Sequence, residues 1–387
     1  MLTKQLIFII KFLQMNKLFI IVNVDWFFLS HRKEIAVSAL NAGYDVTIIA
    51  KDTGKASFIK GLGLKFIDLP MNSVGMNPIE ELRTLNFLYK LYKKEKPDIV
   101  HHVGLKAILW GGLAAKHAKV KGVVNAISGL GVFFAEDNNS VLSKVIVRLL
   151  KYSHNRECLY TIFQNNEDKA LFLKAGIIKE NNVVFIKGSG VDLNLFKYIE
   201  EPVDSKIKVV LTARMIVDKG IFVLTEAAEL LRDEYQNKVQ FLLCGGLDKN
   251  PNAIKEEELK QVCDGTYISW LGYCSNVKEI LEQSHIVTLP SYYKEGLPKS
   301  LIEATAIGRP IITTDSIGCR DTVIDEYNGF LVPIKDSKSL AEKLKILFDD
   351  SDLRKQMGEN SREYAEKYFS LDTVIEQHLE TYKKLIS

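Results

Sequence analysis

The chain has 387 residues, of which 26% are charged and 47% hydrophobic, as in an average soluble globular protein. This length predicts about two domains, and the composition excludes a disordered, collagenous or coiled-coil chain. The net charge of +3 does not indicate a nucleic-acid partner. Residues 1–200, however, hold 27 Lys and Arg against 17 Asp and Glu, a net charge of +10, whereas residues 201–387 hold 24 against 31, a net charge of −7. We therefore expect the first half to face something anionic.

The cysteines indicate neither a disulfide framework nor a zinc site. Their number is odd, and no pair has C-x-x-C spacing. A reducing cytoplasm fits this usage best. The five are Cys158, Cys244, Cys263, Cys274 and Cys319.

The first 14 residues differ from the sequence that follows. Leu6–Ile10 is an apolar run that Lys11 interrupts, and it is much shorter than the ~18–20 residues that a spanning helix needs. No small-residue cleavage site follows it. We interpret Met15 as the true start of the protein and residues 1–14 as an upstream N-terminal extension. The alternative is a short interfacial anchor.

Short apolar runs alternate with helical patterns through the first half, which is typical of a doubly wound parallel sheet. Residues 79–95, for example, have the spacing of an amphipathic helix. The expected strands lie at residues 18–22, 46–49, 99–100, 123–124, 161–163 and 183–186.

This pattern pauses at the polar segment 200–206 and then restarts, so we expect a first domain over 15–200 and a second over 207–370. Ligands of open parallel sheets bind beyond the carboxyl ends of the strands, so the cleft between two such domains is the expected site. The expected strands of the second domain lie at residues 208–212, 241–243, 268–270, 286–289 and 310–313.

Two common nucleotide-binding motifs are missing from the sequence. The first strand is followed by Asn23-Val24-Asp25-Trp26 rather than by G-x-G-x-x-G, and no Walker A motif is present. Hydride transfer and ATP hydrolysis are therefore poorly supported.

The strongest chemical signal lies between residues 290 and 315. A buried strand ends at Pro290, and a Gly-Leu-Pro turn then opens a helix with Lys299 or Ser300 in its first turn. Such a helix N-terminus is an anion site. Glu295 falls in the loop and Glu303 about two turns into the helix; carboxylates accept hydrogen bonds from hydroxyl groups. The combination suits a nucleotide-sugar, with one glutamate for the sugar and one for the ribose.

A second signal follows the first strand of the second domain. Arg214 and Lys219 lie five residues apart, and Gly220 opens the next helix. The two cations could clamp a diphosphate, Arg as a planar fork and Lys as a point charge. By themselves they would be explained as solvated surface cations; together with the Glu295–Glu303 segment they favour a donor site.

These motifs resemble the E-x7-E glycosyltransferases of family 4, which are retaining, metal-independent enzymes of the GT-B fold. The resemblance rests on Arg214…Lys219-Gly220 and Glu295-Gly296-Leu297-Pro298…Glu303. It implies two Rossmann-like α/β domains with parallel sheets facing a cleft, and a C-terminal helix over 371–387 that crosses back to the first domain.

The resemblance also assigns roles in donor binding. Arg214 and Lys219 would bind the donor diphosphate, next to Gly220. Glu295 would contact the donor sugar as a catalytic residue, and Glu303 would bind the ribose hydroxyls. The backbone of Gly296 and Leu297 would meet phosphate or sugar.

The first half resembles bacterial transferases that extend polyprenyl-diphosphate-linked sugars, often with UDP-N-acetylhexosamines. The similarity lies in residues 23–32, 101–102 and 127–131. The family uses a histidine at the end of a first-domain strand, and the position that aligns with it here is Val103. His102 is therefore the first choice for a catalytic histidine and His101 the second. The alternative is a pair of polar loop residues.

An acceptor side is expected in the same domain. The bulky loop that starts at Asp25 and Trp26 replaces the glycine-rich loop of many relatives, and it could line the acceptor site together with Ser128 and Gly129. For Phe27 and Phe28 in this loop, a place in the core is an equally good interpretation.

Residues 141–151 have the pattern of a basic amphipathic helix. Apolar residues share one face, and Lys144, Arg148 and Lys151 lie on another. Such a helix can lie on an anionic membrane surface or pack on the core of its own domain. Lys90, Lys93, Lys94 and Lys96 follow another amphipathic stretch and could add to the same field.

We therefore expect a retaining glycosyltransferase that moves a sugar, an N-acetylhexosamine by resemblance, from UDP to a polyprenyl-diphosphate-linked saccharide. The donor is a substrate, and we expect no cofactor, no metal and no nucleic-acid partner. The place of action would be the cytoplasm, at the inner face of the membrane. The alternatives are an enzyme like the UDP-N-acetylglucosamine 2-epimerases and an inactive nucleotide-sugar-binding protein.

Overall fold

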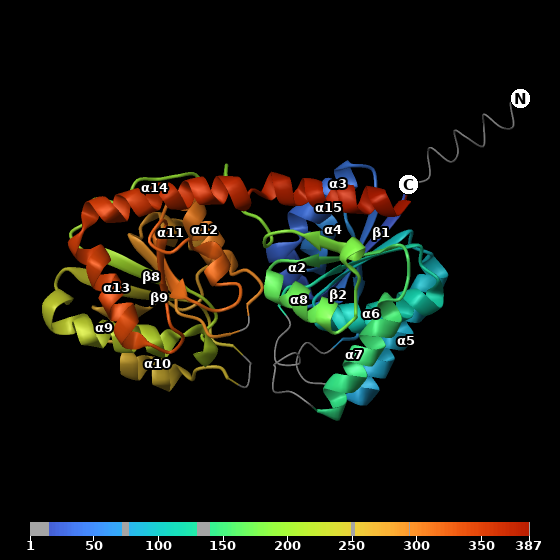
Figure 1. The fold of residues 1–387 in the computed structure, drawn as a ribbon, viewed down its shortest axis with the longest axis horizontal. Helices are drawn as coiled ribbons and strands as arrows, with labels where there is room; N and C mark the ends of the chain where they lie inside the picture. Colours follow the sequence, from blue (N-terminus) through green and yellow to red (C-terminus); the bar gives the residue numbers. More distant parts are fainter. Residues whose placement is uncertain (1–14, 72–76, 130–139, 249–251, 294, 387) are drawn as a thin grey trace, which may run out of the picture. The chain divides into compact units, whose positions relative to one another are not determined.

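The computed structural model describes residues 15–71, 77–129, 140–248, 252–293 and 295–386, which form two compact units (Figure 1). The first unit is the chain up to Ile186 together with the segment from Val374 onward. The second is Lys187–Thr373. The expected extension over residues 1–14 lies outside the described residues.

The first unit is built on a parallel sheet, for which the described residues supply seven strands in the order β3-β2-β1-β4-β5-β6-β7. Its central strands are mostly apolar and buried because helices cover both faces, which leaves neither face for water. The strands are β1 (Lys17–Val24), β2 (Asp45–Lys51), β3 (Lys65–Asp68), β4 (Ile99–Val103), β5 (Gly122–Ala126), β6 (Leu159–Phe163) and β7 (Val183–Phe185).

The helices of the first unit lie between these strands, except for the last one. They are α2 (Asp25–His31), α3 (Lys33–Asn41), α4 (Ala56–Gly61), α5 (Pro78–Glu95), α6 (Leu105–Ala118), α7 (Val141–His154), α8 (Asn166–Lys174) and a 3-10 turn at Glu180–Asn182. Helix α15 (Leu371–Ile386) ends the described chain.

The second unit repeats this architecture with six strands among its described residues, in the order β10-β9-β8-β11-β12-β13. The strands are β8 (Ile207–Thr212), β9 (Val239–Cys244), β10 (Ile268–Trp270), β11 (Ile286–Leu289), β12 (Ile311–Thr314) and β13 (Gly329–Val332). The helices are α9 (Ile221–Tyr235), α10 (Glu256–Val262), α11 (Val277–Glu282), α12 (Lys299–Ile307), α13 (Ser337–Asp349) and α14 (Ser351–Tyr368), with 3-10 turns η3 (Val217–Lys219) and η4 (Arg320–Thr322).

The two parallel α/β sheets confirm the expected fold class, with differences at the edges. The edge strands β3 and β13 were not predicted, and β4 runs through Val103 instead of stopping before His101. Strand β3 was not predicted because it is a short, half-exposed edge strand, and such a strand lacks the continuous apolar run by which buried strands are recognised in the sequence.

The boundary between the units falls at Ile186 rather than at the polar segment 200–206. Residues 187–200 pack on the second unit: the Val191 N–H donates to the Phe369 carbonyl at 2.8 Å, and the Ile199 N–H donates to the Ile307 carbonyl at 3.1 Å. The polar segment 200–206 therefore does not join the two units, because the residues before it are already bound to the second unit by backbone hydrogen bonds.

Helix α15 adds side chains to the core of the first unit from Val374 onward. Tyr382 is buried, and its hydroxyl lies 2.7 Å from His101 Nδ1. Leu385 packs so closely on β5 that its Cβ would lie 2.9 Å from a Cβ at Gly122. The last helix in the sequence therefore completes the domain that begins it.

Within the part of the chain that the structure describes, no helix combines the length and the apolar character required to cross a bilayer.

Candidate active site

The residues predicted to bind a donor meet at the carboxyl end of the second sheet. Strands β8 and β11 are neighbours, and strand order proceeds in opposite directions on either side of this pair. This is the switch point at which open α/β sheets leave a crevice for ligands. The loop after β8 carries Arg214 and Lys219, and the loop after β11 carries Glu295.

Backbone contacts hold these two loops together. The N–H groups of Tyr292 and Tyr293 both donate to the carbonyl of Asp218, at 2.9 and 3.1 Å. Gly220 has φ +78°, and a Cβ at this position would lie 2.1 Å from the Pro290 carbonyl oxygen. Only glycine permits both the left-handed backbone and the close approach.

Lys219 and Glu295 form an ion pair across the two loops, although they are 76 positions apart. Their side chains are only 13% and 11% exposed. The hydroxyl of Ser291 donates to Glu295 Oε1 at 3.0 Å, and Lys219 Nζ lies 5.3 Å from the centre of the Tyr293 ring. The pair is thus oriented by a hydroxyl on one side and flanked by an aromatic face on another.

Arg214 takes a different partner. Its guanidinium donates to Asp248 Oδ2 at 2.8 Å, and its side chain is 47% exposed. Asp248 belongs to the loop that follows β9, the neighbour of β8. The structure therefore places Arg214 at the same sheet edge as Lys219, in contact with the adjoining loop.

Glu303 lies within α12, which begins at Lys299 directly after Pro298, as expected. Lys299 Nζ lies 3.5 Å from Glu303 Oε1, and the Glu303 side chain is 13% exposed. Burial raises the pKa of Glu303 above its ordinary value, and the neighbouring Lys299 ammonium partly opposes this shift. A buried carboxylate of this kind is a strong acceptor for hydroxyl groups.

The turn before α12 is packed closely on the rest of the second unit. A Cβ at Gly318 would lie 2.1 Å from the Gly296 carbonyl oxygen. Leu297 is buried, and its Cδ2 would lie 2.9 Å from a Cβ at Gly188. Two glycines distant in sequence therefore fix the path of Gly296 and Leu297 into the helix N-terminus.

The histidine pair lies in the core of the first unit, which corrects the expectation that it follows a strand end. His101 and His102 are both fully buried inside β4. His102 Nδ1 lies 2.9 Å from Asn125 Oδ1, and its Nε2 lies 3.1 Å from the Tyr92 hydroxyl. Burial lowers the pKa of His102 to about 4. With both ring nitrogens of His102 engaged and both rings enclosed, neither histidine can touch a substrate in this arrangement.

The acceptor-side candidates divide into buried and accessible residues. Asp25 is fully buried; its carboxylate accepts hydrogen bonds from the N–H and hydroxyl of Thr53 and from the N–H of Lys55. Burial alone would raise the pKa of Asp25, but these hydrogen bonds lower it below its ordinary value. Asp25 therefore ties two loops together.

Trp26, Ser128 and Gly129 are not enclosed in this way. Trp26 is exposed beside Asp25 at the end of β1, and Ser128 and Gly129 are half-buried after β5. Of the two phenylalanines in the loop, Phe28 is in the core, while Phe27 is half-buried and stacks on His31. These residues stand at the carboxyl ends of their strands, and Leu130 and Gly131 lie outside the described residues.

Sequence reasoning missed the residues that hold the donor candidates in place. Ser291 at Glu295 and Tyr293 beside Lys219 have no distinctive local pattern, and the sequence did not indicate that Asp248, in the glycine-containing loop after β9, pairs with Arg214. It also missed the pair of Lys106 Nζ and Glu81 Oε1, at 2.7 Å, beside the end of β4. Only the meeting of loops in space identifies them.

Among the described residues, no three or more His, Cys, Asp or Glu side chains are grouped as a metal site would require.

Two family models match the chain in succession. Residues 17–161 match the glycosyl transferase 4-like model, and residues 195–364 match the model of glycosyl transferases group 1. Each match lies within one of the two compact units. The fold and these matches define a two-domain glycosyltransferase of the GT-B type.

Curated relatives of known name are similar over most of the chain. The N,N'-diacetylbacillosaminyl-diphospho-undecaprenol alpha-1,3-N-acetylgalactosaminyltransferase of Campylobacter jejuni is 29% identical over 355 residues, covering 88% of this chain and 92% of the relative. The UDP-Gal:alpha-D-GlcNAc-diphosphoundecaprenol alpha-1,3-galactosyltransferase of Escherichia coli is 26% identical over 332 residues, covering 83% and 84%.

Solved structures share the fold at lower identity. A glycosyltransferase of Rickettsia africae superposes with a TM-score of 0.75 at 21% identity, covering 97% of this chain and 99% of its own. Anabaena HepE in complex with UDP gives a TM-score of 0.75 at 17% identity, covering 96% and 100%.

Proposed function

We propose that this glycosyltransferase moves a sugar, in the first instance an N-acetylhexosamine, from a UDP-sugar to a polyprenyl-diphosphate-linked saccharide during assembly of a surface polysaccharide, O-antigen or glycan. The observation that carries this proposal is the meeting of Lys219 and Glu295 at the switch point of the second sheet, beside α12. A cation, a carboxylate and a helix N-terminus match the diphosphate and hydroxyl groups of a nucleotide-sugar.

In this proposal the donor replaces the contacts that the pair makes in the free chain. Lys219 turns from Glu295 to the diphosphate, with Arg214 as the second cation. Glu295 is then free to accept a hydrogen bond from the sugar, and Glu303 accepts from the ribose. The loop over Gly220 and the turn at Gly296 and Leu297 bring backbone N–H groups to the phosphates.

The transfer breaks the bond between the anomeric carbon and the β-phosphate oxygen and forms a bond to the acceptor hydroxyl oxygen. UDP leaves with the electron pair of the broken bond, and the hydroxyl proton is released. We propose retention of the anomeric configuration and no metal requirement. Support for the latter is that Arg214, Lys219 and the N-terminus of α12 supply positive charge where the leaving group develops negative charge.

The acceptor class rests on the names of the relatives, two of which act on undecaprenyl-diphosphate-linked sugars. We assign the acceptor to the first unit, where Trp26, Ser128 and Gly129 are accessible at strand ends. An acceptor of this type stays in the bilayer, so we propose that the enzyme is a peripheral protein at the cytoplasmic face of the membrane.

The test incubates the purified chain with UDP-GalNAc, UDP-GlcNAc, UDP-galactose or UDP-glucose and a short-chain polyprenyl-diphosphate N-acetylhexosamine in detergent. Mass spectrometry should detect one added sugar, and the coupling constant of the new anomeric proton should show retention. EDTA should leave the rate unchanged; loss of turnover that Mn²⁺ restores would refute metal independence.

Reactions without acceptor separate the alternatives. An epimerase would change the UDP-sugar in the absence of acceptor, and an inactive binding protein would bind UDP-sugars without any transfer. Either result would overturn the proposed reaction.

A further inference from the structure

Helices α5 and α7 flank α6 on the first unit, and all three begin at the same end of it. A helix that connects parallel neighbouring strands runs opposite to them, so its N-terminus lies at their carboxyl ends. The Lys106–Glu81 pair, at 2.7 Å, joins the first turns of α6 and α5, and Lys116 Nζ donates to the Tyr152 carbonyl at 2.6 Å, which joins the last turns of α6 and α7. The N-termini of α5 and α7 therefore lie at the carboxyl end of the sheet.

Helix α7 is divided along its length. Ile146 and Leu150 are buried in a core cluster of the first unit. Val141, Leu142 and Val145, in the first two turns, are 79%, 50% and 42% exposed. The sequence left open whether the apolar face packs on the domain or meets a membrane, and the structure divides that face between packing and exposure.

Helix α5 has the same division. Its interior residues Leu88 and Tyr92 are buried, while Ile79 and Leu82, in its first two turns, are 63% and 60% exposed. We define the apolar tip by the exposed residues of both helices. It consists of Ile79, Leu82, Val141, Leu142 and Val145.

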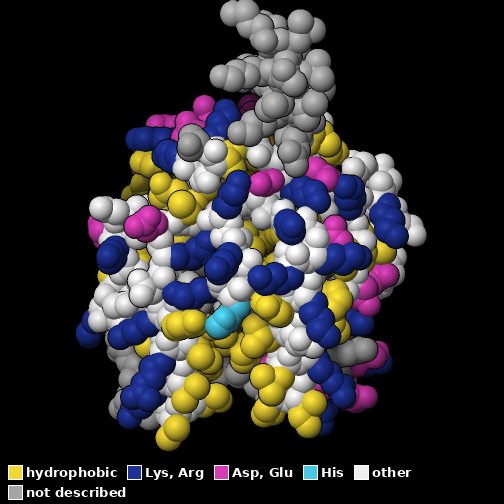
Figure 2. Space-filling view, turned by 90° about the vertical axis from the view of Figure 1, so that its right-hand side faces the viewer, with side chains coloured by type: hydrophobic (Ala, Val, Ile, Leu, Met, Phe, Trp, Pro, Cys, Tyr) yellow, Lys and Arg dark blue, Asp and Glu magenta, His cyan; other side chains and the backbone are white. Residues whose placement is uncertain are grey.

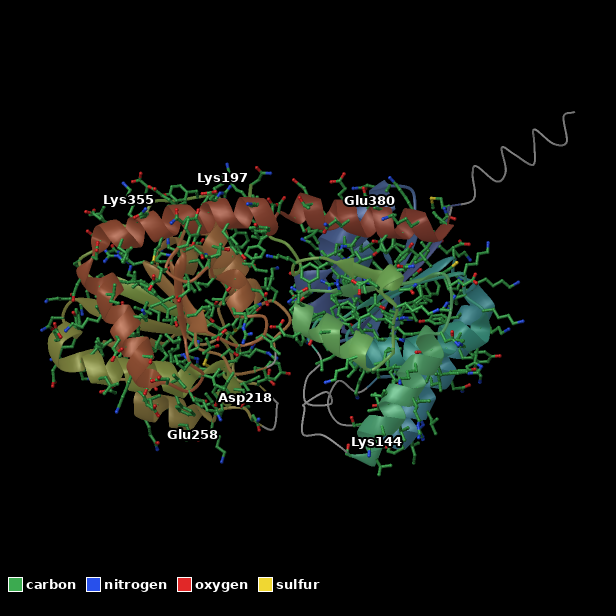
Figure 3. All side chains as sticks on the ribbon, viewed as in Figure 1. Lys144, Lys197, Asp218, Glu258, Lys355 and Glu380 are labelled. Atoms are coloured by element: carbon green, nitrogen blue, oxygen red, sulfur yellow. The ribbon has the colours of Figure 1, made fainter. Side chains whose placement is uncertain are left out.

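Positive charge lies next to the apolar tip. Helix α7 carries Lys144 among the tip residues and Arg148 one turn further along, and it has no Asp or Glu among its residues. Helix α5 carries Glu80 and Glu81 in its first turn, and Glu81 is paired with Lys106. Figure 2 shows the outer face of the first unit, with hydrophobic side chains at its lower rim and Lys and Arg side chains spread above them. Figure 3 places Lys144 at the lower end of α7.

This combination fits one occupant better than others. Large apolar side chains gathered on the surface mark an interaction site. Apolar side chains bordered by cations match the boundary between acyl chains and anionic headgroups, where the apolar groups enter and the cations stay at the surface. The free carboxylates of a protein partner could pair with the cations, but the lipid surface satisfies both features at once.

We propose that the apolar tip inserts into an anionic membrane leaflet, with Lys144 and Arg148 against the headgroups. This deepens the proposed function, because it places the carboxyl end of the first sheet, where the acceptor would bind, next to the bilayer. Attachment then has two components. The electrostatic one is screened by salt, and the inserted one is not.

The test is co-sedimentation of the full chain with vesicles of phosphatidylcholine alone or mixed with phosphatidylglycerol, from 50 mM to 1 M NaCl. The tip variant replaces Ile79, Leu82, Val141 and Leu142 by serine. The matched control is Val203→Ser with Leu230→Ser, two exposed apolar residues of the second unit. We expect binding to anionic vesicles that salt weakens without abolishing, a loss of at least tenfold in the tip variant, and no loss in the control.

A direct readout of insertion uses Leu142→Trp and lipids brominated along the acyl chain. Fluorescence quenching is expected with anionic vesicles, and its absence would overturn the insertion. Unaltered binding by the tip variant, or an equal loss in the control, would overturn it as well. So would a dimer of the wild type that the tip variant abolishes in light scattering, because a second copy would then occupy the tip.

The same variants separate this inference from the proposed reaction. The tip variant should transfer sugar to a detergent-dispersed acceptor at the wild-type rate. If the wild-type chain binds vesicles through the apolar tip but transfers no sugar, the proposed reaction is wrong and the proposed membrane-binding surface is still supported.

Discussion

The ion pair of Lys219 and Glu295 is the most informative contact of the donor candidates. Both groups are nearly enclosed, and both are residues that we propose to bind the nucleotide-sugar. In the free chain they neutralise each other, so neither of these two buried charges is left without a partner. The ion pair therefore keeps the two charges compensated at the carboxyl end of the second sheet.

We predict that Lys219→Met weakens UDP-sugar binding by about 1.5–3 kcal/mol, because it removes a charge-assisted contact and leaves the Glu295 carboxylate beside the phosphates. Isothermal calorimetry measures the affinity. Lys355→Ala is the control, since Figure 3 places this exposed lysine in the same unit, far from Asp218 next to the site. Unchanged donor affinity in Lys219→Met would contradict the assignment. Arg214→Ala should also weaken donor binding, without unfolding the chain.

We predict that replacing Glu303 raises the stability of the fold and lowers its affinity for the donor. Burial raises its pKa in the folded chain, so its contribution to stability is present at low pH and is lost as the pH rises through the folded-state pKa. Glu303→Gln removes this loss. We expect its melting temperature to exceed that of the wild type at pH 7.5, on the order of a few degrees, with a difference that shrinks towards pH 4. Donor affinity should fall in the same variant. A difference that grows on acidification would have the wrong sign for a raised pKa.

At the scale of elements, the meeting of two loops depends on one glycine. Gly220 opens α9 with φ +78° and touches the Pro290 carbonyl, whereas Gly265 has φ +77° and a Cβ added to it would meet nothing within 4 Å. The two positions share the same φ and differ in the space around them. They therefore separate backbone strain from steric overlap.

We predict that Gly265→Ala costs roughly 1–2 kcal/mol of unfolding free energy, because an L-residue is strained in a left-handed backbone. Gly220→Ala should cost a further ~1–3 kcal/mol, because its Cβ overlaps Pro290 and pushes the two loops apart. Urea unfolding measures both variants. Equal costs would show that the loops move apart freely, and would contradict the close contact in the structure.

The pattern of elements also shows where prediction from sequence is dependable. Central strands such as β1 and β8 contain continuous apolar runs, because most positions of a strand covered on both faces are buried. The start of α12 was predicted from Gly-Leu-Pro, since proline fits a position before the first helical turn. The end of β4 was not predicted correctly, because His101 and His102 are polar residues that tertiary packing buries.

At the scale of the whole chain, the first unit is discontinuous in sequence. Its core is complete only when α15 returns, with Val374, Tyr382 and Leu385 in the same core cluster as β1 and β2. The core of the first unit is therefore complete only after α15 has been synthesised and has packed on it.

We predict that a chain ending at Thr373 leaves the first unit unfolded or molten while the second unit still folds. The removed helix exposes the apolar face around Gly122 and leaves His101 without its tyrosine partner. Limited proteolysis with mass spectrometry should then map cuts to the first unit alone. A chain ending at Leu385 retains these contacts and is the control; if the shorter chain resists proteolysis equally, α15 is not part of that core.

The class of fold and the presence of two α/β domains could be predicted from the sequence, and the candidate donor residues could be selected from it. They follow from local chemistry: apolar runs, a glycine between two loops, a proline before a helix, and cations and carboxylates at strand ends. Arg214, Lys219, Glu295 and Glu303 could be chosen because their types suit a nucleotide-sugar and their positions follow strands.

Tertiary packing was needed to establish which of these residues touch, and which polar residues are internal. Lys219 meets Glu295 and Arg214 meets Asp248 because parallel strands far apart in sequence end at one edge of a sheet. His101 and His102 lie inside because helices on either face of β4 cover them. Likewise α7 places Ile146 and Leu150 in a core cluster with residues of α6 and leaves Val141 and Leu142 exposed, a property of packing that no window of sequence contains.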